Sequence, residues 1–182
     1  MRVITGTARG RKLRSPDGYD VRPTTEVTKE AMFSILQFEL EGARVLDLFA
    51  GSGQLGIEAL SRGAEFCTFV DAARASQDLV RENLTTTGLG ARARVMPMDF
   101  LAFLQSTRET FDIAFLDPPY AKGMIDQALP LLADKMSGVG VIVCETDKKE
   151  VLPAQAGAFE IYREYRYGKS KLTVYRRRDS DE

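Results

Sequence analysis

The stretch that decides the fold is VLDLFAGSGQLG, which spans residues 45–56. It begins as a short apolar strand and ends in a turn that carries Gly51, Gly53 and Gly56. Glycine lets the backbone approach a ligand closely, and a strand that runs into such a turn is typical of nucleotide-binding sheets. We therefore expect a cofactor that contains a nucleoside to bind at this turn.

Helical stretches alternate with apolar runs along the rest of the chain. The apolar runs cover residues 44–49, 66–70, 94–98, 111–116 and 140–144, and the helical stretches cover residues 53–61, 73–86, 100–108 and 123–135. This alternation predicts an α/β fold with a mostly parallel sheet that is covered by helices on both faces. Near the end, the runs 159–167 and 171–176 predict an antiparallel hairpin that closes the sheet.

The beginning of the chain does not follow this alternation of apolar runs and helical stretches. Residues 2–5 and 11–14 are separated by Gly6 and Gly10, which predicts a small hairpin or arm. A helix is expected to begin at Pro23 and end near Gly42, and its core-facing side is predicted to carry Val27, Ala31, Ile35 and Phe38. We divide the chain into a basic N-terminal arm at 1–20, one α/β domain at 21–178 and a flexible acidic tail at 179–182.

The amino-acid composition limits the kinds of catalytic and binding sites that the chain can form. The chain has no histidine, which excludes the commonest proton shuttle, the commonest zinc ligand and a Ser-His-Asp triad. Cys67 and Cys144 lie in apolar runs and are expected to be reduced core thiols of a cytoplasmic protein. No apolar stretch approaches the length of a membrane span, so we predict no membrane partner. Because histidine is missing, we predict no bound metal.

The net charge of −1 conceals an uneven distribution. Residues 1–30 and residues 163–182 each carry seven Lys/Arg against four Asp/Glu, whereas the middle of the chain is acidic. These basic segments are either a solvated rim or two edges that bind nucleic-acid phosphates around an acidic body. On the second interpretation, the candidate nucleic-acid contacts are Arg9, Arg11, Lys12, Arg22 and Lys169.

The glycine turn is compatible with two kinds of cofactor. Asp71 follows Gly51 by 20 residues, which matches the ribose-binding acid of a dinucleotide site. Two further acids favour S-adenosylmethionine: Asp47 can receive the ammonium of this cofactor, and Asp99 beside Phe100 can accept its adenine amino group. Asp71 and Asp99 can instead be simple helix caps.

The motif Asp117-Pro118-Pro119-Tyr120 follows the fourth apolar run. The two prolines fix the backbone and remove two donors, so the carbonyl groups remain free to accept hydrogen bonds. Asp117 and the Pro118 carbonyl can each accept one hydrogen of an exocyclic amino group, and Tyr120 can stack on the base. Such a base must be unpaired or flipped out of its helix, and its methylation needs mainly orientation in a dry pocket.

These motifs resemble the bacterial RsmD-type 16S ribosomal RNA guanine-N2 methyltransferases over nearly the whole chain. The resemblance rests on an opening block at 22–36, the cofactor block at 45–64, the Asp117–Tyr120 block, a closing hairpin at 167–172 and the basic start at 6–13. It implies a class I S-adenosylmethionine-dependent methyltransferase, a Rossmann-like fold with seven strands of which the last is antiparallel. The implied partner is 16S ribosomal RNA, with a small-subunit particle as the expected substrate.

The resemblance also assigns residues. The cofactor contacts that we predict are Thr24, Thr25, Asp47, Phe49, Gly51, Ser52, Gly53, Asp71, Asp99 and Phe100, and the catalytic residues are Asp117, Pro118 and Tyr120. Arg22 is expected to meet the cofactor carboxylate or a phosphate. Asp71 departs from the family, in which glutamate is common at this position. The alternatives are a DNA adenine-N6 methyltransferase, a non-catalytic RNA-binding assembly factor and a nicotinamide oxidoreductase.

Overall fold

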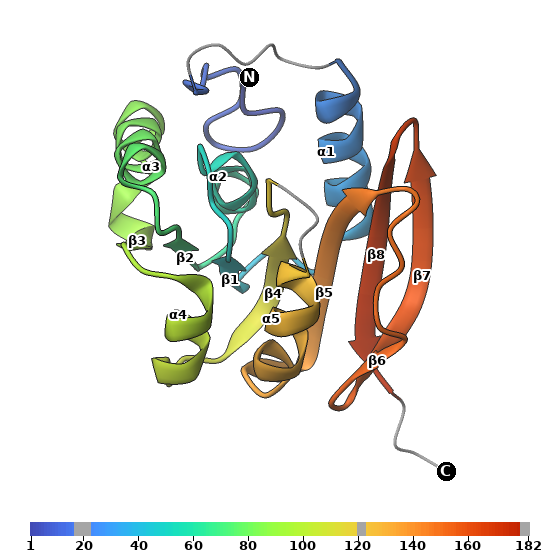
Figure 1. Cartoon of the computed structure of the whole chain (residues 1–182). Helices are drawn as coiled ribbons and strands as arrows, with labels where there is room; N and C mark the ends of the chain where they lie inside the picture. The colour runs from blue at the N-terminus through green and yellow to red at the C-terminus, as the bar shows by residue number, and fades with distance from the viewer. Residues whose placement is uncertain (17–22, 120–122, 179–182) are drawn as a thin grey trace.

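The computed structural model describes residues 1–16, 23–119 and 123–178, and the side chains of residues 23–25 are not described. Its centre is a sheet with the strand order β3-β2-β1-β4-β5-β8-β7-β6 (Figure 1). The predicted α/β fold is therefore confirmed, and the sheet has eight strands where seven were expected, because the two-residue strand β6 is added at one edge.

The first half of the sheet is parallel. It consists of β1 (Arg44–Asp47), β2 (Phe66–Val70), β3 (Ala93–Met96), β4 (Phe111–Leu116) and β5 (Met136–Asp147). The crossovers contain α2 (Gln54–Ser61), α3 (Arg74–Thr87), the short 3-10 helix η1 (Gly90–Arg92), α4 (Phe100–Ser106) and α5 (Met124–Ala133). Parallel strands with helical crossovers bring all their carboxyl ends to one edge, where ligands of such sheets bind.

The second half is antiparallel. The strand β8 (Ser170–Arg177) lies between β5 and β7 (Phe159–Tyr167) and is antiparallel to both, and β6 (Gln155–Ala156) borders β7. The predicted closing hairpin is confirmed, and Gly168 makes its turn possible with a φ of 58°. Because β8 inserts beside β5, the residues at the start of β8 lie at the carboxyl end of the parallel strands.

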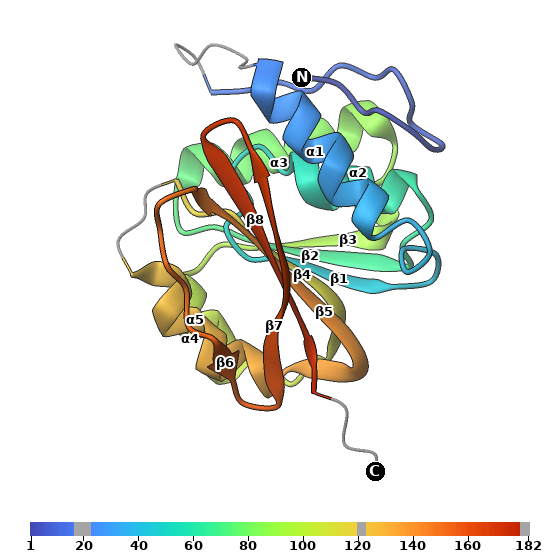
Figure 2. The same ribbon diagram turned by 90° about the vertical axis from the view of Figure 1, so that its right-hand side faces the viewer.

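Helices cover both faces of the sheet, as Figure 2 shows. One apolar cluster joins α1 (Pro23–Ile35), α2 and α3 to alternate strand residues such as Val45, Phe115 and Val143. A second cluster joins α4 and α5 to the residues on the other face, such as Leu46 and Leu116. Cys67 and Cys144 are buried free thiols, one in each cluster, as expected.

The predicted core face of α1 is only partly right: Ala31 and Ile35 are half-buried and pack against the core, but the other two predicted residues do not. Val27 is 55% exposed and Phe38, which lies beyond the end of the helix, is 91% exposed. The buried residues are instead Thr28, Lys29, Met32, Phe33 and Leu36. The apolar pattern missed this stripe because it contains a lysine, whose ammonium is buried against a carboxylate of α2.

The first fourteen residues are docked on the α1–α3 face rather than projecting from it (Figure 1). The predicted hairpin reduces to a single antiparallel bridge between Arg2 and Lys12. Val3, Ala8 and Leu13 are buried in the apolar cluster of this face. Gly6 is required where the segment crosses α2, because a Cβ atom there would lie 1.9 Å from the Ser61 carbonyl oxygen.

Candidate active site

The glycine turn lies between β1 and α2, at the carboxyl edge of the sheet. Gly51 and Gly53 have φ values of 58° and 83°, a region that favours glycine, and Gly53 is the N-cap of α2. Gly56 serves packing instead, because a Cβ atom on it would lie 2.3 Å from the Phe69 ring of β2. The turn thus leaves the half-buried Gly51 open to close approach by a ligand, while Gly53 is buried and α2 packs tightly on the sheet.

Two predicted acids hold this turn in shape. The Asp71 carboxylate accepts hydrogen bonds from the Gly51 amide at 2.9 Å and the Ala73 amide at 2.9 Å. Asp47, at the end of β1, is 2% exposed and accepts one from the Gly56 amide at 3.1 Å. Burial raises the pKa of Asp47 to about 7, the Gly56 amide opposes this rise and the charge of Asp71 adds to it. The two carboxylates are therefore electrostatic neighbours.

Asp99 is the N-cap of α4 and accepts hydrogen bonds from the Leu101 and Ala102 amides at 2.9 and 3.3 Å. Both of these bonds go to one oxygen, so its second oxygen remains available to a ligand. The neighbouring Phe100 packs against Phe49 of the glycine turn, with ring centroids 4.9 Å apart. This places an apolar aromatic pair beside two acids at the same edge, which suits a purine ring with an amino group.

Asp117 follows β4 directly and is half-buried, and Pro118 is half-buried beside it. Burial, with the charges of Glu145 and Asp47, raises the pKa of Asp117 well above its usual range. Glu145 lies on β5, and burial raises its pKa while a hydrogen bond with Ser170 opposes the rise. Sequence reasoning missed Glu145, because a single acid inside a strand carries no motif; only the register of β4 and β5 identifies it.

The structure therefore brings most of the predicted cofactor and base residues to one edge, and their order follows the strands. Asp71 follows β2, Asp47 ends β1, Asp117 follows β4 and Glu145 lies in β5, and these four strands are adjacent in the sheet. We call these four residues the acid row. A row of buried and half-buried carboxylates at one edge of the sheet suits a positively charged ligand with hydroxyl and amino donors.

Some predicted site residues cannot be placed. Tyr120 and Arg22 lie outside the described residues, as does the tail at 179–182, and Thr24 and Thr25 are described only as part of the helix α1. Ser52 is buried, and its carbonyl accepts a hydrogen bond from the Asn83 amide at 2.9 Å. Asn83 belongs to no motif and was not predicted. It also bonds to both backbone groups of Arg14 and so ties the glycine turn to the N-terminal segment.

The predicted nucleic-acid residues have unequal surroundings. Arg9, Arg11, Lys12 and Lys169 are exposed, and no side-chain partner holds them within the described part of the chain. Their neighbours Arg2 and Arg14 pair with Glu26 and Glu82 at 3.3 and 3.0 Å. In the closing hairpin, Lys171 pairs with Glu164, and Arg176 pairs with Glu39. Only some cations of the basic segments therefore lack a side-chain partner in the described part of the chain.

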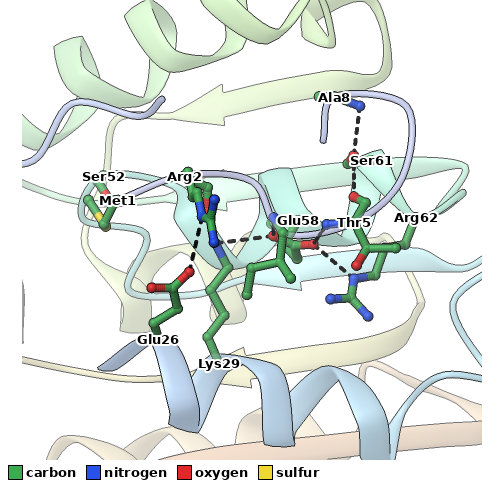
Figure 3. A network of polar contacts seen from close by, with 12 residues as sticks. Met1, Arg2, Thr5, Ala8, Glu26, Lys29, Ser52, Glu58, Ser61 and Arg62 are labelled. Atoms are coloured by element: carbon green, nitrogen blue, oxygen red, sulfur yellow. Dashed lines mark hydrogen bonds and ion pairs between the residues drawn. The ribbon is translucent and has the colours of Figure 1, made fainter. Parts of the chain in front are cut away.

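A buried ion cluster docks the N-terminal segment (Figure 3). Glu58 of α2 is fully buried and accepts hydrogen bonds from the Ile4 and Thr5 amides at 2.9 and 3.0 Å. It also pairs with Lys29 at 3.1 Å and with Arg62 at 2.9 Å. Burial lowers the pKa of Lys29, and the Glu58 carboxylate counteracts this effect. We call Glu58, Lys29 and Arg62 the docking cluster.

Two further properties concern the described residues only. Within these ranges no helix combines the length and the apolar character that crossing a bilayer requires. In the same part of the chain, no three His, Cys, Asp or Glu side chains are grouped so that they could hold a metal ion.

Comparisons with known proteins show the family of this chain. The family model described as "Conserved hypothetical protein 95" matches residues 1–176. Ribosomal RNA small subunit methyltransferase D of Escherichia coli is 35% identical over 97% of this chain and 90% of its own length. The YlbH protein of Bacillus subtilis is 40% identical over 98% of this chain and 100% of its own length.

Among solved structures, the yhhF protein of Escherichia coli superposes with a TM-score of 0.87 at 36% identity, covering 97% of both chains. Both the sequence and the fold therefore agree over almost the full length. The chain belongs to the small-subunit ribosomal RNA methyltransferase D family.

Proposed function

We propose that this protein transfers a methyl group from S-adenosylmethionine to the N2 amino group of a guanine in 16S ribosomal RNA. The observation that carries the proposal is the position of Asp117-Pro118-Pro119 directly after β4, beside the glycine turn that follows the adjacent strand β1. A methyl donor and an amino group can meet only where a cofactor pocket and a base pocket share one edge.

The residues of the site fit the cofactor. The half-buried backbone at Gly51 can approach it, in a turn that Gly53 makes possible, and the Phe49–Phe100 pair with Asp99 suits the adenine ring and its amino group. Asp71 can accept ribose hydroxyls through lone pairs that its two backbone hydrogen bonds leave free. Asp47 can receive the ammonium of the cofactor. Thr24 and Thr25, at the start of α1, are the residues to which we assign contacts with its methionine end. When bound, S-adenosylmethionine supplies an electrophilic methyl group.

The base pocket orients a weak nucleophile. The lone pair of an exocyclic amino group is delocalised into the purine ring, so it must be directed at the methyl carbon. The Asp117 carboxylate and the Pro118 carbonyl each accept one hydrogen of the amino group, and Tyr120 stacks on the base. Orientation of this kind can supply up to about 7–11 kcal/mol of the barrier reduction.

The substrate is held from outside the pocket by phosphate contacts. We assign these contacts to the exposed cations Arg9, Arg11, Lys12 and Lys169, together with Arg22. Their charge offsets that of the acidic catalytic edge, which would otherwise repel RNA. A small-subunit particle in the cytoplasm is the substrate that we propose, because one compact domain offers few contacts for recognising a bare RNA sequence.

Replacement of Asp117 tests this function. We expect Asp117→Ala to abolish methyl transfer to 16S ribosomal RNA, while calorimetry shows S-adenosylmethionine binding within about threefold of the unaltered protein. The control is Asp126→Ala, which removes an exposed carboxylate in the first turn of α5 and should leave the rate unchanged. The methylated position is read by mass spectrometry of the nucleosides, and full activity of Asp117→Ala would contradict the proposal.

A further inference from the structure

Two members of the acid row are direct neighbours on adjacent parallel strands. Leu116 of β4 is in register with Cys144 of β5, so the next residues on the two strands, Asp117 and Glu145, stand side by side. Side chains alternate between the faces of a strand, which places Glu145 on the same face as Val143, toward α1 and α2. The pair therefore opens toward the layer that contains the glycine turn.

Among the described residues, the charged groups that act on the pair are acidic. From β1 the nearest is Asp47, whose charge acts on Asp117, and Asp71 lies beyond it. From β8 the contact to Glu145 is the neutral hydroxyl of Ser170. Lys171 of β8 is turned away, because its ammonium contacts the Glu150 carbonyl and the Glu164 carboxylate. Within the described ranges, neither member of the pair has an ion-pair partner.

A partly buried pair of carboxylates without a cation is costly for the folded protein. Two like charges in one site cannot both ionise easily, so the pair holds a proton more readily than a lone carboxylate does. A bound cation beside the pair reverses this effect, since it stabilises the ionised form. The charge of the pair is therefore set by what lies next to it.

We propose that Glu145 is a positioning residue that makes Asp117 the acceptor of the proton which the substrate amino group releases. The inference rests on the proposed function. In the transfer, a bond forms between the methyl carbon and the amino nitrogen, and the bond from that carbon to sulfur breaks with its electron pair going to sulfur. One N–H bond then breaks, and its proton goes to a carboxylate oxygen of Asp117.

The like charge of Glu145 stabilises the protonated form of Asp117 after the transfer. Before the transfer, the sulfonium charge of the cofactor keeps Asp117 ionised and able to accept the amino hydrogen. After the transfer the sulfur is neutral, and the repulsion between Asp117 and Glu145 favours the protonated acid. The pair thus takes up the proton at the step in which the neighbouring positive charge disappears.

Proton release on cofactor binding tests the pair without any turnover. S-adenosylmethionine is titrated into the protein by calorimetry near pH 6.5, in two buffers that differ in ionisation enthalpy. We expect the unaltered protein to release protons and Glu145→Gln to release measurably fewer, because loss of the Glu145 charge lowers the pKa of Asp117 and leaves less of it protonated before binding. Release from Asp47 is common to both proteins and cancels in the comparison. The control Asp147→Asn removes an exposed carboxylate two residues further along β5 and should match the unaltered protein. Equal proton release from Glu145→Gln would overturn the inference.

The pH dependence of single-turnover methyl transfer gives the second readout. We expect Glu145→Gln to shift the acid limb of the profile to lower pH by about one unit, because a like charge has been removed from Asp117. A purely structural role of Glu145 would lower the rate at every pH without moving this limb. An active variant with an unmoved limb overturns the inference alone, whereas an unaltered protein that does not methylate ribosomal RNA overturns the proposed function as well.

A third measurement applies if Glu145→Gln does not fold. Carbon-13 NMR of the carboxyl groups of the unaltered protein is expected to show a coupled two-step titration of Asp117 and Glu145, with one step well above the ordinary value of about 4. Two independent titrations near that ordinary value would overturn the inference.

Discussion

Glu58 and Asp47 are both buried carboxylates in the same layer of the molecule, but their surroundings differ. Glu58 is fully buried and receives two backbone amides and two cations, so its charge is compensated. Asp47 is 2% exposed, receives one backbone amide and has acidic neighbours. The compensated carboxylate fastens the fold, whereas the uncompensated one stands where a cationic ligand is expected, as perturbed groups at functional sites often do.

The largest effect should come from breaking the compensated site. Glu58→Gln leaves the Lys29 ammonium and part of the Arg62 guanidinium buried without an opposite charge. Removal of one partner of a buried pair costs about 3–5 kcal/mol, so we expect a loss of this size in the free energy of unfolding. Urea denaturation measures it, with a lowered midpoint as the expected result.

The matched control for this variant is Glu82→Gln, which removes the exposed partner of Arg14. An exposed pair contributes at most about 1 kcal/mol, so this variant should be nearly as stable as the unaltered protein. Equal losses in the two variants would mean that the docking cluster is not what holds the N-terminal segment to α2.

Asp47 should behave in the opposite way. Its folded pKa is raised to about 7 from an ordinary value near 4, so ionisation destabilises the fold. This cost is absent below about pH 4, grows as the pH rises between about 4 and 7, and is fully present above about pH 7. Asp47→Asn removes the charge while its amide oxygen can still accept from Gly56.

We therefore expect Asp47→Asn to raise the free energy of unfolding by up to about 4 kcal/mol at pH 8, relative to its effect at pH 4. Calorimetry at pH 8 should show weaker binding of S-adenosylmethionine, because its ammonium loses an opposite charge. Urea denaturation across this pH range checks the stability. If the two proteins differ in free energy of unfolding by an amount that stays constant with pH, the pKa of Asp47 is not raised in the folded protein.

The contrast also explains what could be predicted from the sequence. The sheet and its crossovers followed from apolar runs, and β2 and β4 were predicted to the residue because their ends coincide with polar or turn residues. The glycine turn and the Asp117 motif were found because each carries its chemistry within a few consecutive residues. A site can be recognised from the sequence when its functional residues lie within a few consecutive positions.

What could not be predicted depends on contacts between distant segments. The buried face of α1 was only partly predicted, because a lysine such as Lys29 is expected to be exposed until its partner Glu58 on another helix is known. Glu145 was missed because its role follows from the register of β4 and β5. Asn83 was missed because its partners Ser52 and Arg14 are remote in the sequence. Charge compensation is a property of the folded chain.

The smallest effect should come from cations that belong to neither buried site. Arg9, Arg11 and Lys12 are exposed and without a partner in the described part of the chain. We expect the triple change Arg9→Gln, Arg11→Gln and Lys12→Gln to weaken 16S ribosomal RNA binding about tenfold at physiological salt, without affecting cofactor affinity or stability. Each phosphate contact that is lost should also reduce the slope of log affinity against log salt by about 0.7–0.9.

Fluorescence titration of labelled RNA at several salt concentrations measures both quantities. The matched control neutralises Arg2 and Arg14, which lie in the same segment but already pair with Glu26 and Glu82. Because their charges are partly compensated, this double change should alter the salt slope less than the triple change does. If the two variants reduce the slope equally, net charge alone attracts RNA to this segment. An unchanged slope in the triple variant would remove the segment from the RNA interface, and the phosphate contacts would then have to come from elsewhere on the molecule.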